Sequence, residues 1–107
     1  MKFKIVLTPE ARDDLRELFD YIAEHDGPQR AMTYIGRIER ACMSLQTLPN
    51  RGRLREDIRP GLRVMGFERR ALIAFRVGSS TVAILRILYG GRSVERAFRR
   101  SIKGWSA

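Results

Sequence analysis

The chain has 107 residues, of which 44% are hydrophobic, so it is long enough for one compact domain and too short for two. No apolar run approaches the roughly 18 residues that a membrane-spanning helix needs, and we expect no signal peptide. A single cysteine and a single histidine exclude an internal disulfide and offer no metal cluster, so no cofactor is expected. These features predict one cytoplasmic domain over 1–107 that does not contact a membrane.

Positive charge is concentrated in the second half of the chain. The net charge is +9, yet residues 1–50 carry 7 Lys+Arg against 8 Asp+Glu, whereas residues 51–107 carry 14 Lys+Arg against 4 Asp+Glu. A concentrated positive surface favours a nucleic acid or an acidic protein as partner. The simpler alternative is a basic face that only contacts solvent.

The first half predicts a strand followed by two helices. Residues 2–7 predict a short strand. Thr8 and Pro9 then predict a helix start, because the threonine hydroxyl caps free N–H groups and proline suits the first helical position. Apolar residues recur at helical spacing on both sides of a break at 26–28. Because this break is short, the two helices should form an antiparallel hairpin.

The second half predicts a sheet. Residues 51–60 form a basic segment that we expect to be irregular. Three strands are predicted, at Leu62–Phe67, Ala71–Val77 and Thr81–Leu88, and the short turns between them require antiparallel neighbours. Ser93 is expected to cap a short final helix that runs to Arg100. Residues 101–107 are expected to form a flexible tail.

These elements predict an α+β fold, with an N-terminal strand and a helical hairpin packed on a small antiparallel sheet and a short C-terminal helix. The hairpin should cover one face of the sheet, with Ile38 and Leu45 buried against it. The opposite face then needs another cover, or it is a binding surface.

No residue pattern predicts catalysis. His25 has no nucleophile or metal ligand near it in sequence, so we expect it on the surface. Neighbouring acids such as Asp13 and Asp14 point about 100° apart on a helix, which argues against an acid–base dyad. The arginines remain, and they bind phosphate or carboxylate through two parallel hydrogen bonds. For Arg76 and Arg86, cross-strand ion pairs are an equally good alternative.

An ordered set of motifs resembles the RelE/ParE superfamily of toxins from type II toxin–antitoxin systems. The motifs include Thr8-Pro9-Glu10-Ala11, Ala31-x-x-Tyr34-x-x-x-Ile38, Pro60-Gly61-Leu62-Arg63 and Arg86-Ile87-Leu88-Tyr89-Gly90-Gly91-Arg92. The resemblance covers roughly residues 3–98 and agrees with the fold expected from periodicity. It also implies a cognate antitoxin as partner and a toxin–antitoxin hetero-oligomer.

The resemblance leaves two activities open. RelE-type members cut messenger RNA in the ribosome with basic residues and a C-terminal tyrosine, whereas ParE-type members inhibit DNA gyrase. This chain has Phe98 in place of that tyrosine and Leu72 in place of an arginine, while Arg63 and Arg92 keep the basic character. Phenylalanine cannot transfer a proton, so the ParE-like branch is favoured.

The sequence therefore predicts a toxin that inhibits DNA gyrase by binding, with or without DNA in the contact, and that has no catalytic residue. The expected target-binding residues are Arg63, Arg69, Arg70, Arg92 and Phe98. Two alternatives stay open: a RelE-like ribosome-dependent endonuclease of messenger RNA, and an inactive member that acts in a repressor complex with its antitoxin.

The charge distribution generates a first prediction. Because the second half is strongly basic, the antitoxin segment that contacts it should be acidic, and electrostatic attraction should speed association more than it deepens affinity. Stopped-flow association rates should fall about tenfold or more between low and high salt. A rate that does not change with salt would contradict this expectation.

Overall fold

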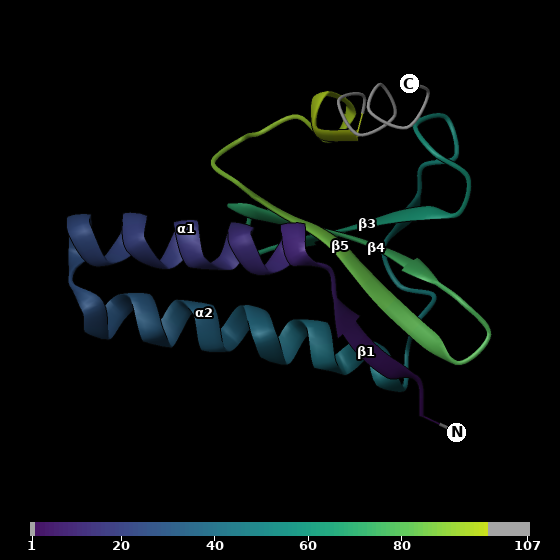
Figure 1. Ribbon diagram of the computed structural model, residues 1–107, viewed down its shortest axis with the longest axis horizontal. Coiled ribbons are helices and arrows are strands. Elements are labelled where there is room, and N and C mark those ends of the chain that lie inside the picture. Colours follow the sequence, from purple (N-terminus) through teal and green to yellow (C-terminus); the bar gives the residue numbers. More distant parts are fainter. Residues whose placement is uncertain (1, 99–107) are drawn as a thin grey trace.

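The computed structural model describes residues 2–98 and shows a helical hairpin packed on a five-stranded sheet (Figure 1). Residues 99 and 100 of the predicted final helix and the predicted tail at 101–107 lie outside the described residues. Within 2–98, no helix is both long and apolar enough to cross a membrane.

The elements follow the predicted order. The first half contains β1 (Lys4–Leu7), α1 (Pro9–Asp26), α2 (Pro28–Met43) and the short 3₁₀ helix η1 (Ser44–Gln46). The second half contains β2 (Arg53–Leu54), β3 (Leu62–Phe67), β4 (Ala71–Val77) and β5 (Thr81–Tyr89), and a helical segment at 94–98 follows. The α+β prediction is confirmed, although the segment predicted to be irregular contributes β2.

The sheet is mixed, with the strand order β1-β5-β4-β3-β2. Strands β3 to β5 pair in antiparallel fashion as predicted. In addition, β2 lies antiparallel to β3, and β1 lies parallel to β5. The short-turn argument covers only β3, β4 and β5, and the sequence makes no prediction for the pairing of β1. A parallel pair needs a long connection, and the helical hairpin together with β2, β3 and β4 supplies it.

Local sequence signals fix the hairpin. The Thr8 hydroxyl accepts a hydrogen bond from the Ala11 N–H at 3.1 Å and donates one to the Leu85 carbonyl at 2.9 Å, so this cap also ties the start of α1 to β5. Gly27 between the helices has a φ of 96°, a conformation that favours glycine. The predicted helix start and break are both confirmed.

Two apolar clusters lie on opposite faces of the sheet. The larger one joins the hairpin to the sheet; Ile38 and Leu45 are fully buried there, as predicted. The smaller one lies on the far face and includes Leu62, Val64 and Phe98. The segment at 94–98 is drawn over the face of the sheet opposite the hairpin in Figure 1, so this face has its own cover.

A buried carboxylate joins α1 to β5 beyond the end of β1. Strand β1 ends at Leu7, opposite Ile84, so within residues 2–98 no strand pairs with that side of β5 from Leu85 onward. The pairing of β4 with β5 also skips Leu85, which produces a β-bulge. Asp14, only 7% exposed, accepts a hydrogen bond from the Ile87 N–H at 2.9 Å at this point.

The same carboxylate holds the Arg86 guanidinium. Arg86 donates from Nε at 2.7 Å and from Nη2 at 3.0 Å, which is the two-bond geometry typical of an arginine–carboxylate pair. These bonds raise the pKa of Arg86. Arg86 therefore pairs with an acid on a helix, whereas the sequence alternative placed that acid on a neighbouring strand.

This arrangement generates a stability prediction. Asp14→Asn removes the counter-charge of a partly buried arginine and should cost about 3 kcal/mol in the free energy of unfolding. The control is Asp13→Asn, whose carboxylate forms an exposed ion pair with Arg16 and should cost less than about 0.5 kcal/mol. Urea unfolding of both variants checks this. Equal losses for the two variants would contradict the assigned role of Asp14.

Candidate functional site

The helical hairpin extends beyond the end of the sheet and forms a corner with it (Figure 1). Tyr89 ends β5 at this corner, with its ring 6.2 Å from Tyr21 of α1 and 5.9 Å from Tyr34 of α2. Tyr21 is 52% exposed, so aromatic surface is presented to solvent. Tyrosine and arginine dominate the binding energy of many protein interfaces, which makes this corner a candidate site.

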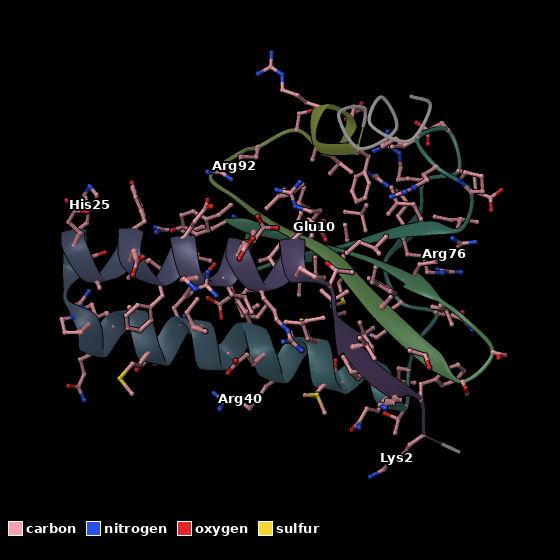
Figure 2. The ribbon with its side chains drawn as sticks, in the orientation of Figure 1. Lys2, Glu10, His25, Arg40, Arg76 and Arg92 are labelled. Atoms are coloured by element: carbon pink, nitrogen blue, oxygen red, sulfur yellow. The ribbon has the colours of Figure 1, made fainter. Side chains whose placement is uncertain are left out.

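Three of the predicted arginines lie at this end of the sheet. Arg69 and Arg70 are in the β3–β4 turn, and the Gly90 N–H donates to the Arg70 carbonyl at 3.0 Å. Arg92 lies two residues after Gly90, and Figure 2 shows Arg92 at the point where the chain leaves β5. The structure therefore brings together residues that are far apart in sequence.

Helix α2 adds two arginines to the corner that we did not predict. Arg30 and Arg37 flank Tyr34 at helical spacing, so the three residues share one side of α2. This spacing is visible in the sequence, but Tyr34 also fits the apolar periodicity of the second helix, which gives no reason to single out the arginines beside it. We call all the tyrosines and arginines of this region the tyrosine–arginine corner; its members are Tyr21, Arg30, Tyr34, Arg37, Arg69, Arg70, Tyr89 and Arg92.

Two pockets flank Tyr89. One has a volume of about 320 Å³, and its lining includes Arg30, Tyr34, Arg37 and Arg70. The other has a volume of about 220 Å³, and its lining includes Glu17, Tyr21 and Arg92. The first pocket therefore presents several guanidinium groups, whereas the second combines one arginine with acidic residues.

An ion pair fixes the β3–β4 turn against α2. Arg37 donates to the two carboxylate oxygens of Glu68 at 2.8 and 2.9 Å. The pair raises the pKa of Arg37 and lowers that of Glu68 below its ordinary value of 4.5, so the pair persists at neutral pH and is lost on acidification below that value. The guanidinium also lies 5.2 Å from the centre of the Tyr34 ring.

The turn itself has an unusual backbone. Glu68 and Arg69 have φ values of 48° and 60°, a region that favours glycine and asparagine over long side chains. Two successive positive φ values are the pattern of a type I′ hairpin turn, for which Asn-Gly is the preferred sequence. The chain therefore keeps Glu68 and Arg69 here at a cost in stability.

Arg63 and Phe98 lie away from the corner. Arg63 alternates with Leu62 and Val64 of the far-face cluster, as predicted, and donates to the Asn50 and Arg51 carbonyls at 3.3 and 3.4 Å. Phe98 is 2% exposed and packs in that far-face cluster. A target could touch the Phe98 ring only if the segment at 94–98 moved off the sheet.

This placement separates the residues that the family resemblance aligned with the ribonuclease site. Leu72 and Phe98 pack on the far face of the sheet, whereas Arg63 belongs to the opposite face. Arg92 is at a third place, after β5. Within 2–98, these four residues do not converge on one position where a phosphate could be held.

A second group of arginines borders the far face. Arg59, Arg76 and Arg86 line a pocket of about 180 Å³ together with Phe98. Figure 2 shows Arg76 on the opposite side of the molecule from Arg92. Arg59 lies 5.5 Å from the centre of the Phe98 ring, and burial together with the charge of Arg76 lowers its pKa. No acid among the described residues forms an ion pair with Arg76.

Other potentially reactive groups are occupied or inaccessible. His25 is exposed at the end of α1, as predicted, and stacks on Tyr21 with ring centres 4.2 Å apart. Burial raises the pKa of the Cys42 thiol to about 11, so the reactive thiolate is scarce at neutral pH. Among residues 2–98, no group of three His, Cys, Asp or Glu side chains is arranged to hold a metal.

Comparison with known proteins agrees with the fold described above. The family model described as ParE toxin of type II toxin-antitoxin system, parDE, matches residues 5–94. The chain belongs to the ParE toxin family. Toxin ParE3 of Caulobacter vibrioides is 33% identical over 87 residues, which are 81% of this chain and 86% of that toxin. Toxin ParE1 of Mycobacterium tuberculosis is 27% identical over 90% of this chain and 98% of its own length.

Solved structures show the same fold in toxin–antitoxin systems. A chain from the chromosomal ParDE system of P. aeruginosa superposes with a TM-score of 0.73 at 29% identity, over 83% of this toxin and 97% of that chain. A chain from the RelBE2 toxin–antitoxin complex of Mycobacterium tuberculosis gives a TM-score of 0.57 at 21% identity, over 83% of this toxin and 99% of that chain. The predicted superfamily and its ParE-like branch are confirmed.

The strained turn generates a prediction. In the toxin, replacing Glu68-Arg69 by Asn-Gly supplies residues that adopt positive φ readily and should gain about 1 kcal/mol from the backbone. The loss of the exposed Arg37–Glu68 pair should offset only part of this gain. The measurement is urea unfolding, with Glu68→Gln as the variant that removes the pair alone. A net loss of stability in the Asn-Gly variant would show that the turn is not strained.

Proposed function

We propose that this toxin inhibits DNA gyrase in the cytoplasm by binding to it, and that a cognate antitoxin neutralises it in a hetero-oligomer. Membership of the ParE family carries the antitoxin part of the proposal. The tyrosine–arginine corner supports the binding part, because it presents aromatic and guanidinium groups from both helices, the β3–β4 turn and the end of β5. Gyrase as the target rests on the resemblance described from the sequence.

Binding without catalysis fits the described residues. Ribonuclease chemistry requires both stabilisation of charge on the phosphate and proton transfer. Phe98 supplies no proton, and Arg63 lies on the opposite face of the sheet from it. A binding inhibitor needs only a complementary surface, and Arg69, Arg70 and Arg92 supply positive charge at the corner.

A second candidate function is cleavage of messenger RNA at the far face. The observation that favours it is the pocket that Arg59, Arg76 and Arg86 line together with Phe98. These arginines could hold a phosphate, but arginine does not act as a base near neutral pH. An inactive member that works only in a repressor complex would show neither activity.

The test combines a gyrase supercoiling assay with primer extension on messenger RNA from induced cells. Wild-type toxin should block supercoiling at roughly stoichiometric ratios to gyrase and should leave messenger RNA intact. Phe98→Tyr should remain unable to cleave messenger RNA, because Leu72 still leaves the far face without a cation at that position. Cleavage within codons together with normal supercoiling would overturn the proposal.

Matched charge reversals locate the contact. Arg69→Glu and Arg92→Glu change exposed residues of the corner and should weaken gyrase inhibition about tenfold or more. Arg12→Glu makes the same charge change on an exposed residue of α1 outside the corner and should have little effect. Equal weakening by all three variants would indicate long-range attraction rather than a contact at the corner.

A further inference from the structure

The 320 Å³ pocket of the tyrosine–arginine corner has the features of a carboxylate site. Arg30, Arg37 and Arg70 line it from α2 and the β3–β4 turn, and Asp26 is the acidic residue in its lining. Its volume suits one side chain or a short peptide segment but is too small for a nucleic acid duplex. The pocket therefore selects a small anionic group.

The three arginines differ in how they are engaged. Arg37 donates two hydrogen bonds to Glu68, so the guanidinium of Arg37 is already paired with a carboxylate of the toxin itself. Tyr89 is the group that most raises the pKa of Arg70, and no acid among the described residues forms an ion pair with Arg70. Arg30 is exposed and forms no ion pair with any described residue. Arg30 and Arg70 thus keep positive charge that no described acid neutralises directly.

Tyr34 adds an independent observation. Its hydroxyl oxygen is buried, yet within the described part of the chain it has no hydrogen-bond partner. A buried polar group without a partner reduces stability, so such a group calls for an explanation. Tyr34 also lines the pocket, where a bound oxygen would give this hydroxyl an acceptor.

The N-terminus of α2 also favours an anion in this pocket. The helix starts beside the pocket without a side-chain cap and without an acidic residue in its first turn. Gln29 and Arg30 of that turn line the pocket. The positive end of the helix dipole is therefore not compensated by an acid on α2 itself, which favours an incoming anion.

We propose that this pocket binds a carboxylate side chain of the antitoxin, with Arg30 and Arg70 as the cationic ligands and the Tyr34 hydroxyl as a hydrogen-bond donor. The antitoxin as source of the carboxylate rests on the proposed function. A basic toxin attracts an acidic partner segment, and the planar guanidinium groups match a carboxylate in geometry. The pocket belongs to the same corner as the proposed gyrase contact, but its lining does not include Arg69 or Arg92, the two residues whose charge reversal tests that contact.

The direct test uses a short peptide and does not depend on gyrase. Acetyl-Leu-Glu-Leu-amide is titrated into ¹⁵N-labelled toxin, with acetyl-Leu-Gln-Leu-amide and inorganic phosphate as comparison ligands. The glutamate peptide should shift the resonances of Arg30, Arg70 and Tyr34 saturably in the millimolar range. The glutamine peptide should bind about tenfold more weakly, because it lacks the charge. Equal binding of the two peptides, or tighter binding of phosphate, would overturn the carboxylate assignment.

Variants separate the site from general electrostatics. Arg30→Gln should weaken the glutamate peptide about tenfold, whereas Arg40→Gln should leave its affinity unchanged. Arg40 is on the same helix and, as Figure 2 shows, points away from the sheet. Equal weakening by both variants would mean that only net charge matters.

Tyr34→Phe gives a second readout. It removes a hydroxyl that has no hydrogen-bond partner among residues 2–98, so the urea midpoint should stay the same or rise while peptide affinity falls. A lower urea midpoint with unchanged peptide affinity would show that the hydroxyl serves the fold rather than a ligand.

The complex with the cognate antitoxin identifies the source of the carboxylate. Arg30→Gln should speed its dissociation about tenfold relative to Arg40→Gln. If the peptide binds as expected but the two variants dissociate equally, the antitoxin is not the source. Because gyrase is absent from these experiments, failure of gyrase inhibition would leave their outcome unaffected.

Discussion

The hairpin of this toxin is held over the sheet by the Asp14 carboxylate, which accepts a backbone hydrogen bond that a neighbouring strand would otherwise accept. Strand β1 is only four residues long, so β5 continues past it, and no other strand in the described part of the chain pairs with that side. Asp14 satisfies the Ile87 N–H there and binds the Arg86 guanidinium with the same carboxylate. An unpaired backbone group at this buried position would be costly, so Asp14 determines where α1 lies against the sheet.

The candidate site depends on that placement. Because α1 is fixed against β5, the far ends of α1 and α2 extend past the sheet, and Tyr21 and Tyr34 approach Tyr89. The Arg37–Glu68 pair then brings the β3–β4 turn to the same corner. A surface of aromatic and guanidinium groups on rigid elements suits recognition of a partner, and its chemistry is that of binding rather than bond cleavage.

The sequence predicts most of the fold, because periodicity and turn residues act locally. Thr8, Gly27 and Ser93 mark element boundaries that the structure confirms. The sequence could not predict the parallel pairing of β1 with β5, because that pairing depends on the order of the strands in space. The burial of Asp14 was also missed, since an acid in the first turns of a helix is usually explained by the helix dipole. The corner was predicted only in part, because tertiary packing brings α2 to the turn.

Hydrogen exchange at the Ile87 amide tests the central claim most directly. If Asp14 replaces a strand, the Ile87 N–H should exchange as slowly as amides paired between β4 and β5, although no described strand pairs with β5 on the side of this N–H. Asp14→Asn should speed its exchange far more than it speeds exchange at Ile73, which lies opposite Ile87 on β4. Fast exchange of Ile87 in the wild-type toxin, or equal acceleration at both amides in the variant, would contradict this account.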